Sequence, residues 1–271
     1  MFGERLKSAC RLLVVFDKQG AKNNLLINAV NLAKLLNGAI DILYVINPNS
    51  IADSDSQLNV IRKMEEENSK VDKKLRKLVN EIFEQERIPI LYNIVTGNFQ
   101  FNVKAHIEKT KPEVVVLQNN SNKTFFSSKK NFVPSFLSKF KGLVFLSGAT
   151  QLKRPEKSLK LSCFESLTKL GNNKLFLKLL ENVSAAIYVF RATDSNDPGS
   201  TNDLNRKLDK KTTVYEFDIN RETTDFSKYL SLSNTDILCV SNSIDGKKSM
   251  QYDKYKNVIR KNKLPLLIFQ N

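Results

Sequence analysis

The chain has 271 residues, enough for one large domain or two of ordinary size, and a chain of this length does not need disulfide bonds to fold. Its net charge of +15 raises the question of nucleic-acid binding, but residues 1–150 carry 22 Lys and Arg against 14 Asp and Glu, and residues 151–271 carry 21 against 14. A dedicated polyanion groove would concentrate that excess, so the even spread favours a generally basic surface and argues against nucleic acid as a partner.

The cysteines and the N-terminal sequence bear on the compartment of the protein. Cys10, Cys163 and Cys239 form no metal-type cluster, and the last two fall in predicted strands, where a thiol acts as a small apolar filler. The first apolar run begins at Leu12 and is too short for a signal sequence, and no stretch has the length of a membrane helix. We therefore expect a cytoplasmic protein without membrane insertion.

Apolar runs alternate with helical spacings along the first half of the chain. The predicted order is strand 12–16, helix 23–36, strand 39–46, helix 57–86, strand 88–95, a helix that opens at Gly97-Asn98, strand 114–117, a short helix within 132–140 and strand 143–146. This alternation predicts a parallel sheet with helices on both faces.

The long helix over residues 57–86 is expected to be amphipathic. Glu65–Glu67 and the neighbouring lysines belong to its solvated face. Its apolar positions are Leu58, Ile61, Met64, Val71, Leu75, Leu78, Val79 and Ile82.

The same pattern returns after a polar, basic linker near residues 150–157. Shifts of 148 and 144 match the first two strands to later ones, and from the third strand onward a single shift of 123 holds. It places Tyr92 on Tyr215, residues 113–119 on 236–242, and residues 143–146 on 266–269. Internal repetition of this kind predicts two α/β domains, residues 1–150 and 151–271, with the second copy 21 residues shorter between its second and third strands.

Several short motifs resemble those of tandem universal stress proteins. They are Asp17 after the first strand, Leu43-Tyr44-Val45 closing the second, Val95-Thr96-Gly97-Asn98, and Pro112-Glu113-Val114-Val115-Val116. The resemblance implies two tandem adenine-nucleotide-hydrolase-like sandwiches of three layers, each with a mostly parallel five-stranded sheet. It also implies that the two units pair through their fifth strands, 143–146 and 266–269, within the chain or in a homodimer.

The sequence departs from that family where the family binds ATP. ATP-binding members resemble one another in a Gly-x-x-Gly motif followed by Gly-Ser/Thr after the fourth strand. Residues 119–131 contain no glycine here, Lys130-Asn131 stands in place of Gly-Ser, and the second copy, residues 241–253, has only Gly246. Side chains at these positions crowd a close approach of phosphate to the backbone, so both nucleotide sites are expected to be degenerate and no cofactor is expected.

Two other functions remain open from the sequence. One is that the first copy still binds ATP. Asp17 would then hydrogen-bond to the base or ribose, and Lys123, Lys129 or Lys130 would contact the phosphates. Asp17 could equally cap the following helix. The candidate cofactor-binding residues are Asp17, Val45, Gly97, Asn119, Lys130 and Asn131.

The second alternative is binding of nucleic acid or an anionic surface through a loop of alternating basic and aromatic residues. Residues 118–141 contain five lysines and five phenylalanines. Phe132, Phe136 and Phe140 have core-like helical spacing, whereas Phe125, Phe126 and Lys129 lack that periodicity and are candidates for a partner contact.

No motif of an enzyme accompanies these features. There is no nucleophile elbow and no clustered pair of carboxylates, and His106 is the only histidine, for which we expect a structural role. The leading hypothesis is a non-enzymatic universal stress protein-like protein with a regulatory or protective role in the stress response.

Overall fold

A computed structural model of the chain divides into two compact units, residues 1–117 and 118–271. The structure describes residues 10–16, 23–48, 57–118, 136, 139–148, 150–152, 159–164, 173–183, 187–192, 212–217, 230, 232–242 and 264–270. The predicted helix within 132–140 lies largely outside these residues.

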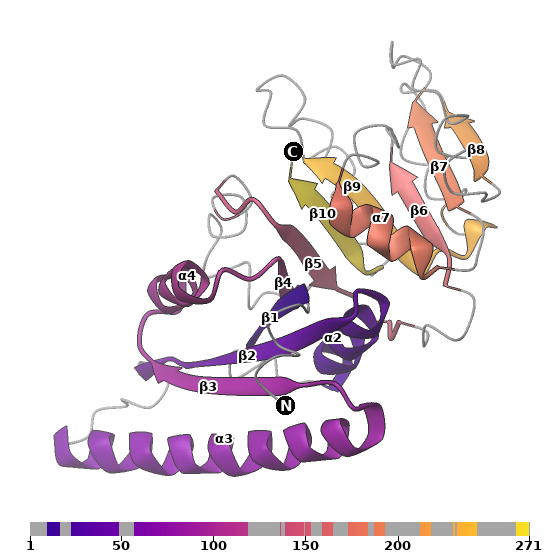
Figure 1. The fold of residues 1–271 in the computed structure, drawn as a ribbon. Coiled ribbons are helices and arrows are strands. Elements are labelled where there is room, and N and C mark those ends of the chain that lie inside the picture. The colour runs from indigo at the N-terminus through magenta and orange to yellow at the C-terminus, as the bar shows by residue number, and fades with distance from the viewer. Residues whose placement is uncertain are drawn as a thin grey trace. The chain divides into compact units, whose positions relative to one another are not determined.

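The first unit is built on four parallel strands in the order β3-β2-β1-β4 (Figure 1). Its elements are β1 (Cys10–Phe16), α2 (Asn23–Leu35), β2 (Gly38–Ile46), α3 (Gln57–Glu86), β3 (Ile90–Thr96), α4 (Phe99–Thr110) and β4 (Val114–Gln118). The apolar runs predicted as strands form the centre of this sheet, and all five residues of β4 are buried. The predicted parallel α/β arrangement is confirmed.

The helices of this unit cover both faces of the sheet. Tyr92 of β3 donates its hydroxyl to Asp72 of α3, while Asp41 of β2 contacts His106 of α4. Tyr92 pairs in register with Ile42, so the two side chains lie on the same face of the sheet. Asp41 is next to Ile42 in β2, and successive residues of a strand face opposite sides, so Asp41 lies on the other face. Hence α3 lies on one face and α4 on the other, as right-handed crossovers require when the chain returns from β3 to β4.

Gly38 permits a close approach of the backbone at the start of β2. A Cβ at this position would lie 2.5 Å from Leu12 Cδ1 and 2.7 Å from the Cys10 carbonyl oxygen. Any other residue would push β1 and β2 apart where their pairing begins at Cys10↔Gly38.

The helix predicted over residues 57–86 coincides with α3, but its first turns are not part of the core. Leu58 is 72% exposed and Ile61 is 53% exposed, whereas Val71 and Leu75 are buried. The sequence identified Leu58 and Ile61 as apolar positions of the helix, but the structure leaves both of them exposed. A helix rises about 1.5 Å per residue and a strand about 3.3 Å per residue. The 30 residues of α3 are therefore longer than the 9 residues of β2, and the sheet cannot cover the whole of α3.

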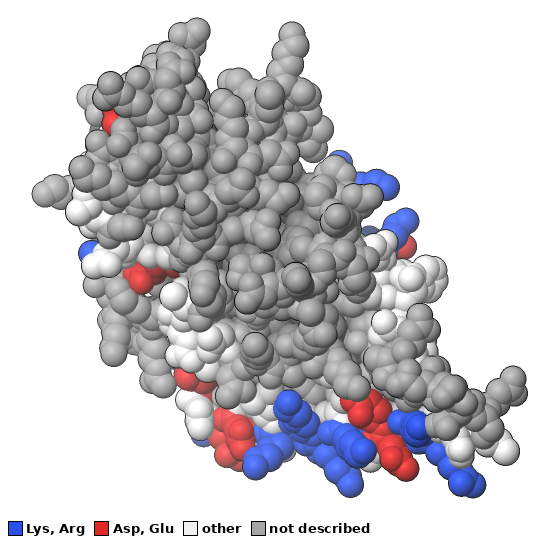
Figure 2. Space-filling view, turned by 180° about the vertical axis from the view of Figure 1, so that it is seen from behind, with Lys and Arg blue, Asp and Glu red and all other residues white. Residues whose placement is uncertain are grey.

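The outer face of α3 is strongly charged. Figure 2 shows blue and red side chains alternating along the side of the molecule where α3 lies in Figure 1. Its exposed charged residues are Arg62, Lys63, Glu65, Glu66, Lys70, Lys73, Lys74, Arg76, Lys77, Glu81 and Glu84. Mixed signs at helical spacing are typical of a solvated helix face, which agrees with the expectation for Glu65 and Glu66.

The second unit contains six strands in the order β5-β10-β9-β6-β7-β8. Its elements are β5 (Leu143–Ser147), β6 (Leu161–Phe164), α7 (Lys174–Glu181), β7 (Ile187–Ala192), β8 (Thr212–Phe217), β9 (Ile237–Asn242) and β10 (Leu266–Gln270). The strands are parallel except that β5 and β10 run antiparallel, with Leu143 opposite Phe269 and Leu146 opposite Leu266. The pairing predicted for residues 143–146 and 266–269 is confirmed, and it occurs within the chain.

The pairing of β5 with β10 places β5 in the second compact unit. The repeat of the sequence, by contrast, assigns residues 143–146 to the first copy, with the predicted boundary at residue 150. The two ways of dividing the chain differ because a sequence repeat is defined by the order of residues, whereas a compact unit is defined by which residues pack together.

The strand order within each unit follows the same scheme. β3-β2-β1-β4 in the first unit corresponds to β8-β7-β6-β9 in the second, and the starts of β4 and β9, and of β5 and β10, are each separated by 123 residues. Arg11 N donates to Glu113 Oε2 at 2.8 Å, and Lys160 N donates to Asp236 Oδ2 at 2.8 Å. This agreement in order, spacing and local contact supports the proposed duplication.

Cys163 and Cys239 lie opposite each other in the neighbouring strands β6 and β9. Both side chains are fully buried and neither forms a disulfide. Burial, with a smaller effect from the Cys163 side chain, raises the pKa of Cys239 well above its ordinary value. The burial of both side chains confirms the prediction that these thiols fill space in the core.

Candidate functional site

The strands of the first unit end together at one edge of its sheet. β1, β2, β3 and β4 are parallel and end at Phe16, Ile46, Thr96 and Gln118. In open parallel sheets ligands bind beyond the carboxyl ends of the strands, so this edge is the candidate functional site.

The turn after β3 has the geometry that its sequence predicted. Gly97 adopts φ 138°, a conformation that favours glycine, and its N–H donates to the Ile46 carbonyl at 3.0 Å. Asn98 caps α4 by accepting from Phe101 N at 3.1 Å, and Asn102 donates back to the Asn98 carbonyl at 2.9 Å. The prediction that Gly97-Asn98 opens a helix is confirmed, and the turn ties the end of β3 to the end of β2.

Two of the candidate cofactor-binding residues belong to this edge in the described structure. Val45 is buried in the penultimate position of β2 and pairs in register with Val95 of β3. Gly97 follows β3 directly and is hydrogen-bonded to the last residue of β2. Val45 and Gly97 therefore lie on adjacent strand ends, where the sequence placed them.

The other candidates lie outside the residues that the structure describes. They are the cofactor-binding candidates Asp17, Asn119, Lys130 and Asn131 and the partner-contact candidates Phe125, Phe126 and Lys129. Their contribution to a site remains a prediction from the sequence.

Gln118 was not among the candidates, yet it is the most unusual polar residue of the described edge. It is the last residue of β4 and is 7% exposed, and its Oε1 accepts no hydrogen bond in the structure. A buried carbonyl oxygen without a donor costs about 1–3 kcal/mol, and a ligand that donates a hydrogen bond would remove that cost. The sequence signal was a single amide side chain at the end of an otherwise apolar strand.

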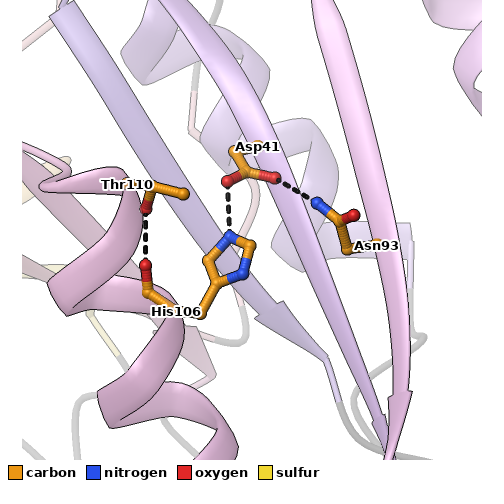
Figure 3. A network of polar contacts seen from close by, with 4 residues as sticks. All are labelled: Asp41, Asn93, His106 and Thr110. Carbon is orange, nitrogen blue, oxygen red and sulfur yellow. Dashed lines mark hydrogen bonds and ion pairs between the residues drawn. The ribbon is translucent and has the colours of Figure 1, made fainter.

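His106 forms a polar cluster on the α4 face of the sheet. Its Nε2 lies 2.6 Å from Asp41 Oδ2, so the ring N–H donates to the carboxylate, and Asn93 donates to the other oxygen at 3.5 Å (Figure 3). Thr110 donates to the His106 carbonyl at 2.9 Å.

This cluster is remote from the strand ends. Asp41 lies five residues before Ile46, which corresponds to about 16 Å at about 3.3 Å per strand residue. The ring and the carboxylate are 11% and 22% exposed, and their contact joins α4 to β2. The geometry agrees with a structural role for His106.

Neither a metal centre nor a membrane span is found in the described part of the chain. No group of three or more His, Cys, Asp or Glu side chains there is arranged to hold a metal ion. No helix among the described residues is long and apolar enough to cross a membrane.

Solved structures bear out the expected α/β fold. A universal stress protein from Archaeoglobus fulgidus DSM 4304 superposes with a TM-score of 0.68 at 13% sequence identity, covering 96% of this chain and 96% of that one. A putative universal stress protein from Pseudomonas aeruginosa UCBPP-PA14 has a TM-score of 0.60 at 11% identity, covering 98% of this chain and 94% of that one. The chain therefore has the universal stress protein fold.

The fold is not confined to proteins of that name. The cytoplasmic domain of a prokaryotic cation chloride cotransporter has a TM-score of 0.55 at 13% identity, covering 96% of this chain and 95% of that one. No protein-family model matches the sequence, and no curated protein sequence matches it either. At such low identity the fold is shared, and function has to be argued from the site.

Proposed function

We propose that the protein is a non-enzymatic, cytoplasmic protein of universal stress type with a regulatory or protective role, and that its strand-end site does not hold ATP in the manner of that fold. The observation that carries the proposal is the sequence that follows β4, a strand that ends at the ligand edge of a parallel sheet. This sequence has no glycine from residue 118 to residue 141. A backbone cradle for phosphate needs N–H groups that the phosphate can approach closely, and we expect side chains in place of glycine to obstruct that approach.

The described part of the edge supports this proposal. It offers Val45, which is apolar, and Gly97, whose N–H is already donated to Ile46 at 3.0 Å. Among the described residues of this edge, no Lys or Arg side chain is available to neutralise a triphosphate. Binding of a protein or of an uncharged ligand suits such a surface better than binding of a polyanion.

Thermal unfolding of the purified chain with ATP, ADP or AMP and Mg²⁺ tests the proposal. We expect a change in Tm of less than about 1 °C at millimolar nucleotide and no release of phosphate from ATP. A ligand at a hundred times its Kd stabilises a protein by about 2.7 kcal/mol, which raises Tm by about 5 °C or more in a domain of 150–250 residues. A shift of that size with ATP, or steady hydrolysis, contradicts the proposal.

One observation favours a second candidate function, adenine-nucleotide binding by the first unit. The unpaired Oε1 of Gln118 is an acceptor at the end of β4, and the exocyclic amine of adenine is a donor that would satisfy it. In that case AMP should stabilise the protein as well as ATP does, because the base rather than the phosphates supplies the contact. Gln118→Leu should abolish the stabilisation, whereas the control Ser241→Ala, at the matching position of the second copy, should retain it; the absence of any nucleotide effect removes this candidate.

A further inference from the structure

A cavity lies on the opposite side of the first unit's sheet from α4, between the sheet and helices α2 and α3. Its volume is about 400 Å³, within the range of small-molecule sites. The lining residues are Phe16, Leu26, Ile27, Tyr44, Val71, Lys74, Leu75, Lys77, Leu78, Glu81, Ile82 and Gln85.

The inner wall of this cavity is apolar. Phe16 and Tyr44 are register partners on β1 and β2, and Leu26 and Leu75 contribute from the two helices. All four side chains are at most 6% exposed. A hydrocarbon chain placed against them would leave water and gain the usual stabilisation of apolar burial.

The outer wall is polar and carries more positive than negative charge. Successive turns of α3 contribute Lys74, Lys77 and Glu81. The distance from Lys77 Nζ to Glu81 Oε1 is 3.9 Å. That pair offsets one positive charge, and no described acidic side chain pairs with Lys74. The cavity therefore combines an apolar interior with one uncompensated cation at its mouth.

The two helices are held together near their C-terminal ends. Lys34 of α2 forms an ion pair with Glu86 of α3, and both side chains are 18% exposed. The cavity lies nearer the start of α2, where Leu26 and Ile27 face α3 residues that come before Glu86. A space of this size is left between helices that are otherwise anchored, although close packing is the rule in protein interiors.

We propose that this cavity binds an aliphatic carboxylate, with the hydrocarbon chain between α2 and α3 and the carboxylate at Lys74. The volume of the cavity has room for roughly a dozen carbon-sized groups at about 30 Å³ each, so a medium-chain fatty acid fits it. An alkylammonium ion would place a positive charge against Lys74, and an alcohol would leave that cation without a partner. The proposal concerns a different site from the strand-end edge and is independent of the function proposed for it.

Isothermal titration of the full chain with decanoate, below the concentration at which it forms micelles, tests the proposal. We expect saturable binding of one decanoate per chain and binding at least about tenfold weaker for decanol and for decyltrimethylammonium. Lys74→Glu should weaken decanoate binding at least about tenfold, because it replaces an attractive charge by a repulsive one. The matched control Lys73→Glu makes the same change of charge one residue away. Lys73 is exposed, as Lys74 is, but it does not line the cavity, so the control should leave binding within about twofold.

A second pair of variants tests the position of the hydrocarbon chain. Ile27 is 36% exposed and lines the cavity, so Ile27→Trp fills the space from its rim and should abolish binding without unfolding the core. Ile61→Trp makes the same change at an exposed position of α3 away from the cavity and should bind as the wild type does. The proposal is overturned if decanoate does not bind, if decanol binds as tightly, if Lys73→Glu and Lys74→Glu act alike, or if Ile27→Trp leaves binding unchanged.

Discussion

At the scale of single residues, the acidic side chains that precede β4 and β9 form the same kind of hydrogen bond with the backbone. Glu113 and Asp236 each accept a backbone N–H, from Arg11 and Lys160, at 2.8 Å. In return Glu113 N donates to the Arg11 carbonyl at 3.0 Å and Asp236 N to the Lys160 carbonyl at 2.9 Å. The first reciprocal pair fixes where β4 begins relative to β1, and the second fixes where β9 begins relative to β6.

We expect Glu113→Ala and Asp236→Ala each to lower the free energy of unfolding by about 1–2 kcal/mol, because each removes a carboxylate that accepts a hydrogen bond from a backbone N–H. Denaturant unfolding followed by circular dichroism measures the change. The control is Glu108→Ala, which removes only an exposed pair with Lys104 at 3.8 Å and should cost a few tenths of a kcal/mol. Equal losses in all three variants would contradict a specific role for the two contacts.

At the scale of elements, α3 has two halves with different surroundings although its sequence is amphipathic throughout. The half that includes Val71 and Leu75 packs on the sheet, and the half that includes Leu58 and Ile61 is exposed. The energy that holds α3 to the unit must therefore come from its second half.

Leu75→Ala should lower the free energy of unfolding by about 2–3 kcal/mol, since it removes a buried side chain that the surrounding atoms cannot fully replace. Leu58→Ala makes the same chemical change on the same helix and should alter it by no more than about 0.5 kcal/mol, because Leu58 is 72% exposed. Chemical denaturation of both variants measures the two changes in the free energy of unfolding. A loss of more than about 1 kcal/mol for Leu58→Ala would show that something covers the start of α3 in solution.

At the scale of the whole molecule, the antiparallel pairing of β5 with β10 determines which edges remain for other chains. The four residues from Leu266 to Phe269 pair with residues from Leu146 to Leu143 of the same chain, and all of them are buried. An edge that is already paired cannot accept a strand from a second copy.

We therefore expect the purified chain to be a monomer, with a mass near 30.9 kDa by light scattering after size-exclusion chromatography at micromolar concentration. A stable mass of twice that value would contradict this expectation and favour the homodimer that the sequence left open. Repeating the measurement at a tenfold lower concentration separates a stable dimer from weak association.

The order of elements could be predicted from the sequence, because apolar periodicity is a property of the chain itself. The duplication was inferred from equal spacings in the sequence and remains a prediction. The helix over residues 57–86 and the turn at Gly97-Asn98 followed from such local signals. The pairing of residues 143–146 with 266–269 followed from the family resemblance. The absence of glycine after β4 was also visible in the sequence, and it remains the main argument about nucleotide binding.

Only the tertiary structure decided which apolar residues are buried and which polar groups lack a partner. Leu58 and Leu75 carry the same side chain on the same helix, yet they differ in exposure because the sheet lies opposite only one of them. The unpaired oxygen of Gln118 and the cavity between α2 and α3 likewise depend on atoms from distant segments of the chain. A sequence pattern specifies what one element presents, whereas burial and hydrogen bonding depend on what the rest of the fold places against it.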